Sequence, residues 1–252
     1  MKEMNVKLDE KKINLSLKGV DAKVIYHIYE GFKLNTLLVS FGEKRRVIST
    51  LDGYKEVPFV GNTYTPLALS ESTMKLHNYQ EFKRNFPLAL GIDPELITFL
   101  STGVDMDQLA VCEKSYDEFT VCCLATAGAK GNALRTGVEN AKYVERDGNF
   151  GLATGTINTL LLTNATLSSG AMARAIITIT EAKTAALQDL NVRSISSPQY
   201  QATGTGTDNI IVVSGKMGKP LLLTSGHTKI GELIGCSTKI AITEALRKHD
   251  GL

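Results

Sequence analysis

One amphipathic segment, flanked by two short apolar runs, constrains this chain more than any other feature. Residues 156–164, TINTLLLTN, are apolar over the length of a buried strand, and residues 209–214, NIIVVS, form a second such run. Ser168 or Ser169 can cap a helix over 170–190. The apolar face of that helix carries one lysine and repeats near the helical period: Met172, Ile176, Ile179, Lys183, Ala186, Leu187 and Leu190. Together, the two strands and the helix predict a crossover connection within one sheet.

The rest of the chain also mixes strands with helices. Further strands are predicted at 23–29, 34–41, 119–125 and 221–223. Helices are expected at 70–86 and at about 228–248. Turn-forming residues predict a loop over 52–68, and these are Gly53, Pro58, Gly61 and Pro66. With no repeat and no low-complexity linker, the sequence predicts one α+β domain over 1–252, with the N-terminal strands of 1–41 at its periphery.

Composition excludes several classes of partner. The 28 basic and 26 acidic residues leave a net charge of +2, so no strong field favours nucleic acid or an anionic membrane. The basic run at 44–46 is interpreted as a solvated turn. No run approaches the roughly 20 apolar residues of a membrane helix, and no signal peptide is expected. Four cysteines without a CxxC pair indicate a reduced, cytoplasmic protein. The four histidines lie far apart, so neither a metal site nor a cofactor is predicted.

The run at 156–164 begins with polar side chains that packing alone does not require. Thr156 and Asn158 share one face with Leu160 and Leu162 because side chains alternate along a strand. A threonine hydroxyl becomes a nucleophile when a base takes its proton, and a neighbouring amide can orient a carbonyl or a water. Alternatively, both side chains hydrogen-bond to backbone at the end of the strand. The pattern alone leaves both interpretations open.

Three loops of small residues lie at 101–104, 125–137 and 202–208. Such loops bring backbone N–H groups close to a ligand and can build an oxyanion hole. Their candidate substrate-binding residues are Gly128, Lys130, Asn132, Arg135, Thr203, Thr205, Thr207 and Asp208. Glu181 is a candidate general base and His227 a candidate substrate contact. The alternatives are solvated charges for Lys130, Arg135 and Glu181, a turn cap for Asp208, and a loop position for His227.

Several segments, taken in order, resemble the adenosylcobinamide amidohydrolase family (CbiZ). They are ATAGAKGNALRTG, GTINTLLLTNATLS, AMARAIITITEAKTAALQDLNV, QATGTGTDNIIVVSG and SGHTKIGELIG. LGIDPE at 90–95 and STGV at 101–104 also fit. The chain departs from the family after Ser49-Thr50, where LDGYKEVPFVGNTY replaces a glycine-rich stretch with an Asn-Gly pair. The resemblance implies hydrolysis of the aminopropanol amide of adenosylcobinamide to adenosylcobyric acid, a corrinoid salvage step associated mainly with archaea. The substrate would bring its own cobalt.

GTINTLLLTNATL also resembles, more distantly, the segment after the cleavage point in ornithine acetyltransferases and DmpA-type aminopeptidases. This resemblance implies an αββα sandwich with mixed sheets flanked by helices. It also implies Thr156 as the nucleophile and Thr102-Gly103 as the oxyanion turn. Without cleavage before Thr156, that residue has no free α-amine to act as a base. An acyltransferase or self-processing aminopeptidase, and a non-catalytic corrinoid-binding protein, remain the alternatives to the amidohydrolase. The sequence leaves a homo-oligomer open.

Overall fold

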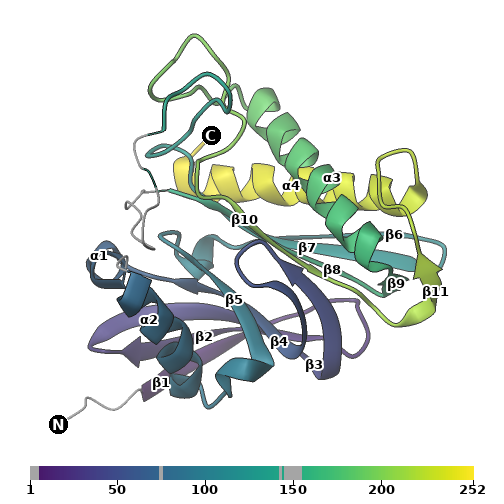
Figure 1. The fold of residues 1–252 in the computed structure, drawn as a ribbon, viewed down its shortest axis with the longest axis horizontal. Helices are drawn as coiled ribbons and strands as arrows, with labels where there is room; N and C mark the ends of the chain where they lie inside the picture. The colour runs from purple at the N-terminus through teal and green to yellow at the C-terminus, as the bar shows by residue number, and fades with distance from the viewer. Residues whose placement is uncertain (1–5, 74–75, 142–143, 145–154) are drawn as a thin grey trace.

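β3 (Phe32–Ser49) is 18 residues long and connects the two halves of the molecule. The computed structural model describes residues 6–73, 76–141, 144 and 155–252. The first part of β3 pairs with β2 (Asp21–Tyr29), and its last residues pair with β10 (Asn209–Val213). Between Ser40 and Arg45 the pairing register shifts, and Gly42 there adopts a φ of 66°. The strand bends at this point and enters both sheet layers (Figure 1).

The lower layer holds β1 (Val6–Ile13), β2, the first part of β3, β4 (Gly53–Tyr64) and β5 (Ile97–Thr102). Its outer face is covered by α1 (Leu67–Thr73) and α2 (Leu76–Ala89) (Figure 1). A 3₁₀ helix, η1 (Pro94–Leu96), leads into β5. Aromatic rings, including those of Phe82, Phe86 and Phe99, pack between α2 and this layer.

The upper layer continues from β3 through β10, β8 (Ile157–Thr163) and β7 (Phe119–Ala127) to β6 (Ala110–Tyr116). α3 (Ser169–Asp189) and α4 (Lys229–Asp250) cover its outer face (Figure 1). β8 and β10 are parallel neighbours joined through α3, so the predicted crossover connection is confirmed. Ser168 caps α3 by accepting a hydrogen bond from Ala171 N. A second 3₁₀ helix, η2 (Met106–Gln108), precedes β6, and β9 (Ala165–Leu167) pairs with β11 (Met217–Leu221) in a small separate sheet.

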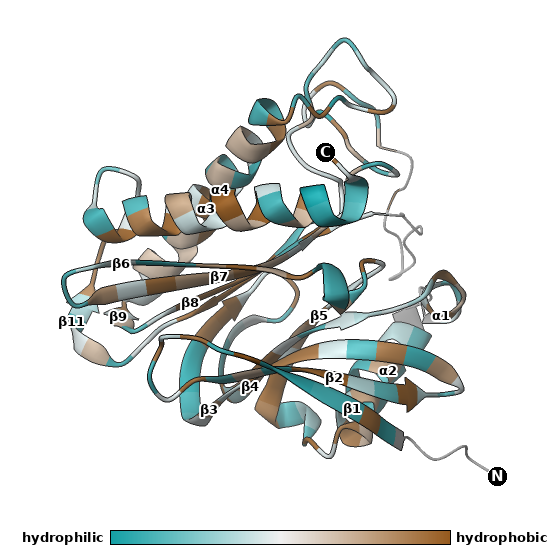
Figure 2. Cartoon of the chain, turned by 180° about the vertical axis from the view of Figure 1, so that it is seen from behind, coloured by the Kyte–Doolittle hydropathy of each residue, from teal (hydrophilic) through white to brown (hydrophobic). Residues whose placement is uncertain are grey.

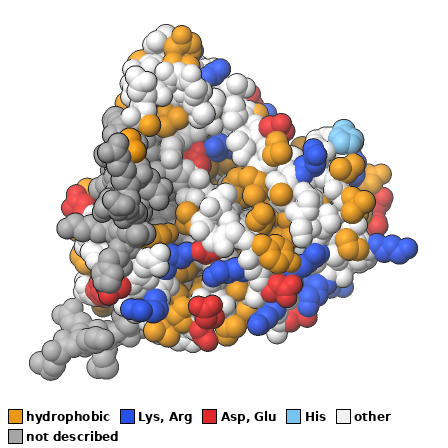
Figure 3. All heavy atoms as spheres, in the orientation of Figure 1, with side chains coloured by type: hydrophobic (Ala, Val, Ile, Leu, Met, Phe, Trp, Pro, Cys, Tyr) orange, Lys and Arg blue, Asp and Glu red, His pale blue; other side chains and the backbone are white. Residues whose placement is uncertain are grey.

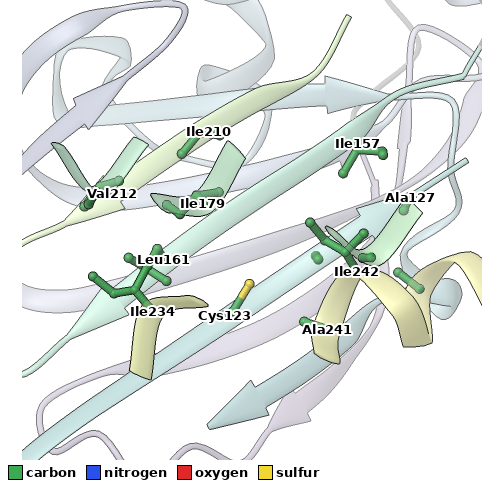
Figure 4. Close-up of a cluster of buried hydrophobic side chains, with 14 of the residues drawn as sticks. Cys123, Ala127, Ile157, Leu161, Ile179, Ile210, Val212, Ile234, Ala241 and Ile242 are labelled. Carbon is green, nitrogen blue, oxygen red and sulfur yellow. The ribbon is translucent and has the colours of Figure 1, made fainter. Parts of the chain in front are cut away.

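Apolar cores fill the spaces between successive layers. One lies under α2, one between the two sheet layers, and one under α3 and α4. Cys122 and Cys123 point to opposite faces of β7, because Cys122 lies in the core between the sheets and Cys123 in the core beneath α4. Figure 4 shows Cys123 beside Leu161 and Ile234 in the second of these. Figure 2 shows the apolar stretches of the strands within the layered body of the molecule. The αββα architecture expected from the sequence is therefore the one observed.

The largest error of the sequence prediction falls in residues 52–68, which were expected to form a loop. Residues 53–64 form β4, which pairs with both β3 and β5. Pro58 has no partner because it faces the register shift in β3, so its missing N–H breaks no ladder bond. Gly61 lies so close to β3 that an added Cβ would be 2.9 Å from Leu37 O. Residues that break isolated strands are thus accommodated by a bulge and by a close backbone approach.

Two further expectations are refined by the structure. The sequence predicts a peripheral place for residues 1–41; β1 lies at an edge of the sheet, whereas β2 and β3 contribute buried side chains to the cores. The predicted solvated turn at 44–46 is wrong, because Arg45 and Arg46 are half-buried within β3. Elsewhere, charged side chains of both signs are dispersed over the face shown in Figure 3. Among the described residues, no helix is long and apolar enough to span a membrane.

Candidate functional site

β8 begins at two polar side chains that lie next to each other. Thr156 directly precedes the strand and is 6% exposed, and Asn158 is fully buried. Thr156 Oγ1 donates a hydrogen bond to Thr207 O at 2.6 Å and lies 3.5 Å from Asn158 Oδ1. The two side chains share one face of the strand, as its two-residue period requires. A buried hydroxyl with an amide oxygen beside it therefore stands at one end of the upper sheet.

A buried network fixes the orientation of Asn158. Its Nδ2 donates to Asn62 Oδ1 and to Ser101 O, both at 2.9 Å. Asn62 Nδ2 in turn donates to Thr126 Oγ1 at 2.9 Å. Because both donors of the Asn158 amide are used, its oxygen is the atom left facing Thr156. The network links the upper sheet to β4 and β5 of the lower one, so the site lies where the two layers meet.

Asn62 is a site residue that the sequence analysis missed. It lies in β4, within the segment predicted as a loop. The resemblance to the family expects an Asn-Gly pair in this region, and Gly61-Asn62 carries the same two residue types in reverse order. That pair was the available signal. The observed contact with Asn158 places Asn62, and with it part of LDGYKEVPFVGNTY, in the site.

The carbonyl groups of Gly155 and Thr156 are held by two of the small-residue loops. The Gly155 carbonyl accepts from Asn132 Nδ2 at 3.2 Å and from Thr207 Oγ1 at 2.8 Å. On the other side, Gly128 N donates to Thr156 O at 3.0 Å. Gly155 has a φ of 91°, and an added Cβ would lie 2.8 Å from Gly128 O. Glycine is therefore required at 155 both for its conformation and for space.

Asp208 accepts four hydrogen bonds, one from β8, two from its own loop and one from α3. Its Oδ1 accepts from Ile157 N at 3.1 Å and from Thr205 Oγ1 at 2.5 Å. Its Oδ2 accepts from Thr205 N at 3.1 Å and from Lys183 Nζ at 2.5 Å. Gly204 has no room for a side chain, because a Cβ would lie 2.4 Å from Oδ2. A carboxylate so fully occupied positions the start of β8 and is poorly placed to take a proton from Thr156.

Lys183 was not assigned to the site from the sequence, where it is one position in the apolar face of α3. Its side chain is 12% exposed and forms an ion pair with Asp208, whose side chain is 13% exposed. A lysine within an apolar helical stripe was the signal, since lysine is rarely buried without a partner. The pair ties α3 to the loop that precedes β10.

The end of α4 supports the loop at 125–137. Asp250 is 4% exposed, and its Oδ2 accepts from Ala129 N at 2.7 Å. The ring of the neighbouring His249 packs so closely on Gly128 that an added Cβ there would be 2.8 Å from it. The C-terminal helix thus holds the loop that contacts Thr156 O.

The turn containing Thr102 and Gly103 adjoins this group, because Ser101 O accepts from Asn158. Thr102 is buried, its carbonyl accepts from Thr65 N at 2.8 Å, and its Oγ1 accepts from Val104 N at 3.0 Å. Gly103 is exposed. The role of this pair as an oxyanion turn stays a prediction.

Two predicted substrate contacts are engaged within the protein. Arg135 Nη1 donates to Gln201 O at 3.2 Å, and Thr203 Oγ1 accepts from Thr136 N at 3.0 Å. The first joins the loop at 125–137 to Gln201, and the second joins it to the loop at 202–208. Lys130, at the tip of the first loop, is exposed and so remains accessible to a ligand.

Glu181 and His227 stand apart from the other candidates. Glu181 is exposed on α3, and none of the described hydrogen bonds or ion pairs joins it to Thr156 or Asp208. His227 is exposed just before α4, with its Nδ1 3.1 Å from Ser225 Oγ. α4 has 22 residues, a length of about 33 Å, and its opposite end contacts Gly128. His227 therefore lies at the other end of α4 from the loop at 125–137, and its role as a substrate contact stays a prediction. No group of metal-binding side chains occurs among the described residues.

Comparisons with known proteins agree with this assembly of motifs. Residues 21–252 match the model of the CbiZ family, described as adenosylcobinamide amidohydrolase. The uncharacterized protein MJ1613 of Methanocaldococcus jannaschii is 48% identical over 225 residues, covering 85% of this chain and 87% of that protein.

Distant similarities to solved structures also occur. The PH0078 protein of Pyrococcus horikoshii has 12% identity and a TM-score of 0.41, covering 97% of this chain and 83% of its own. An L-aminopeptidase D-Ala-esterase/amidase of Ochrobactrum anthropi has 9% identity and a TM-score of 0.41, covering 92% and 84%. On the family match, which spans nearly the whole chain, this protein belongs to the adenosylcobinamide amidohydrolase family.

Proposed function

We propose that this protein hydrolyses the amide between the corrin propionate arm and aminopropanol in adenosylcobinamide, releasing adenosylcobyric acid. Family membership supports the reaction class. The observation that carries the proposal is the buried Thr156 hydroxyl beside the fixed Asn158 oxygen, at the point where the small-residue loops meet. An amide is a stable bond, so its cleavage requires an activated water or a nucleophile supplied by the protein.

In the proposed reaction, Thr156 Oγ1 attacks the carbonyl carbon of the propionate amide. Asn158 Oδ1 orients the hydroxyl, and the N–H groups of the turn at 102–103 donate to the oxygen that becomes negative. The C–N bond breaks, and the proton lost by the hydroxyl is delivered to the leaving aminopropanol nitrogen. Water then hydrolyses the ester formed on Thr156 and restores the hydroxyl. In the competing pathway, Thr156 positions a water that attacks directly, and no ester forms.

The protein's part in binding is assigned from the polar and charged side chains of the loops beside Thr156. The corrin rim carries many amides, so neutral donors and acceptors suit it better than charges. Asn132, Thr205 and Thr207 hold the loops, and we assign them a supporting role next to the substrate. Lys130 is the exposed cation at the loop tip. In this proposal the only cobalt is the one that the substrate carries, and no metal held by the protein takes part.

The decisive experiment incubates purified protein with adenosylcobinamide and measures adenosylcobyric acid and free aminopropanol by mass spectrometry. We expect the two products in equal amounts. Tight binding without either product would indicate a corrinoid carrier instead. The absence of both binding and product would reject a corrinoid as the substrate.

One observation favours a second candidate, a self-processing enzyme. The Gly155 carbonyl already accepts hydrogen bonds from Asn132 and Thr207, and the Thr156 hydroxyl is on the next residue. Attack by that hydroxyl on the Gly155 carbonyl carbon would move the acyl group from nitrogen to oxygen, and water would then release two fragments. Cleavage would give Thr156 a free α-amine to serve as a base. Intact mass separates the candidates: one chain of 252 residues excludes processing, and fragments 1–155 and 156–252 demonstrate it.

A further inference from the structure

A cavity of about 470 Å³ lies at the other end of the sandwich from Thr156. Its wall includes Thr163, which ends β8, the adjacent Asn164, and Val213, which ends β10. The seven residues of β8 span about 23 Å, so the cavity is separate from the candidate active site. Phe41 and Leu162 of the core between the sheets also line it. The cavity therefore enters the space between the two layers.

Arg45 brings an unused hydrogen-bond donor to this cavity. Its side chain is 14% exposed, and its Nε is buried without a partner among the described residues. The guanidinium contacts the half-exposed Glu43 through Nη2, at 3.3 Å. One other described buried side-chain atom, Thr238 Oγ1, is similarly unpaired, but it lies next to the Cys123 thiol. An unmade hydrogen bond on a buried charged group carries an energetic cost. A bound acceptor would remove that cost.

The charges at the cavity favour an anion. Lys18 and Lys216 line it together with Arg45, whereas Glu118 is the one carboxylate in its wall. Glu43 pairs with Arg45 and, at 2.5 Å, with Lys216, so one carboxylate is shared by two cations. Neighbouring polar side chains of the wall are engaged within the protein. Thr163 Oγ1 donates to Thr120 O, and Asn164 bonds to Thr120 N and Glu118 O. Arg45 Nε is thus the buried donor in this wall that lacks a partner among the described residues.

The inner wall is apolar. Leu17, Phe41, Leu162 and Val213 are all buried and line the cavity. We propose that this cavity binds an organic anion with an apolar body, such as a medium-chain carboxylate. Its head group accepts a hydrogen bond from Arg45 Nε near the mouth, and its chain packs against Phe41 and Leu162. Arg45, the central residue of the basic run at 44–46, then has a ligand-binding role that the active site does not explain.

Isothermal titration with octanoate, 1-octanol and acetate tests the proposal. Octanoate has both the anionic head and the apolar body, and each of the other probes has one of them. We expect saturable binding of octanoate at one site and at least tenfold weaker binding of 1-octanol and of acetate. Equal affinity for octanol and octanoate would overturn the anionic part of the proposal. The absence of saturable octanoate binding would overturn the whole proposal.

Variants locate the site. Arg45→Gln should weaken octanoate binding at least tenfold, and Lys44→Gln, an exposed neighbour outside this cavity, should leave it within twofold of the wild type. Lys216→Gln changes a half-exposed side chain and should weaken binding severalfold even if Arg45→Gln proves unstable. Thr156→Ala should bind octanoate like the wild type. Unchanged binding in both Arg45→Gln and Lys216→Gln, or loss of binding in Thr156→Ala, would place the site elsewhere.

Discussion

The groups around Thr156 make its hydroxyl a candidate nucleophile. Its hydroxyl donates to the Thr207 carbonyl, and the Asn158 oxygen is the other polar atom beside it. Asn158 in turn is fixed by Asn62 and by a backbone carbonyl. The sequence predicts that Thr156 and Asn158 share a face, because that depends only on the strand period. It does not predict Asn62 or Lys183, because each meets its partner through tertiary packing of a distant segment.

Replacement of Thr156 tests the nucleophile directly. Thr156→Ala should reduce amide hydrolysis by at least about 100- to 1,000-fold, the scale on which loss of one oxyanion donor is felt. Corrinoid binding should survive, and Thr156→Ser should retain part of the activity. Thr159→Ala, on the opposite face of β8, is the matched control. Rapid quenching followed by mass spectrometry should show a cobyric acid ester on Thr156. A modest loss of rate with no ester would favour a water held by Thr156.

His27 gives the fold a pH dependence. It is 3% exposed, its Nε2 lies 2.9 Å from Thr36 Oγ1, and its ring packs against Phe86. Burial away from water lowers the pKa of His27 from 6.5 to about 4. The folded protein therefore keeps this ring neutral while the unfolded chain takes up a proton below about pH 6.5. The stability that His27 contributes is present at pH 7 and is lost as the pH falls towards 4.

Urea unfolding at pH 7 and pH 5 measures this effect. At pH 5 the wild type should lose about 2 kcal/mol through His27 alone, from about 1.4 kcal/mol per pH unit below the unfolded pKa. His27→Phe keeps a ring against Phe86 and should lose correspondingly less between the two pH values. The exposed His227→Phe serves as control and should behave like the wild type. An equal pH dependence in His27→Phe and the wild type would show that His27 is not the titrating group.

Among the elements, α3 and the strands beside it were the most predictable. Their signals are local: an apolar helical period, a serine cap and two apolar runs. β4 was missed for a physical reason, since its glycines and proline disfavour an isolated strand. A bulge in β3 and close contact with the Leu37 carbonyl make the strand possible, and both depend on the neighbouring strand. The sequence alone does not show that His227 and the turn contacting Gly128 lie at opposite ends of α4, because that depends on the length of the helix and on which end packs against the loop.

α4 contributes to the site through its last turn. Asp250 accepts from Ala129 N and so holds the loop that contacts Thr156 O. Asp250→Ala should lower kcat/KM for adenosylcobinamide about tenfold, because the loop loses a charge-assisted bond worth roughly 1–3 kcal/mol. Hydrogen exchange at the Ala129 amide should become faster. Glu244→Ala, also on α4 and half-exposed, should change neither quantity. An Ala129 amide equally protected in Asp250→Ala would mean that the contact does not hold the loop.

At the scale of the whole molecule, one sheet of nine strands runs through both layers. β3 belongs to each of them, and the buried network of Asn62 and Asn158 crosses between them. The two layers share one apolar core and cannot separate without exposing it. We therefore expect a single cooperative unfolding transition.

Circular dichroism at increasing urea, compared with hydrogen exchange of amides in β2 and in β8, checks that expectation. Both sets of amides should report the same midpoint and the same free energy of unfolding. Because the chain has no tryptophan, amide exchange is the better site-specific probe. Earlier unfolding of β2 than of β8 would show that the layers behave as independent units.

The length of β3 also bears on how the chain is made. Thr50, next to the end of β3, bonds to Ile210 O across 160 residues. A ribosome must therefore complete most of the polypeptide before β10 is available to pair with β3. Until then, the apolar face of the first strands has no second sheet to cover it. Long-range pairing of this kind slows folding and leaves an intermediate prone to association. The newly made N-terminal half is thus the stage at which a chaperone would most improve the yield of folded protein.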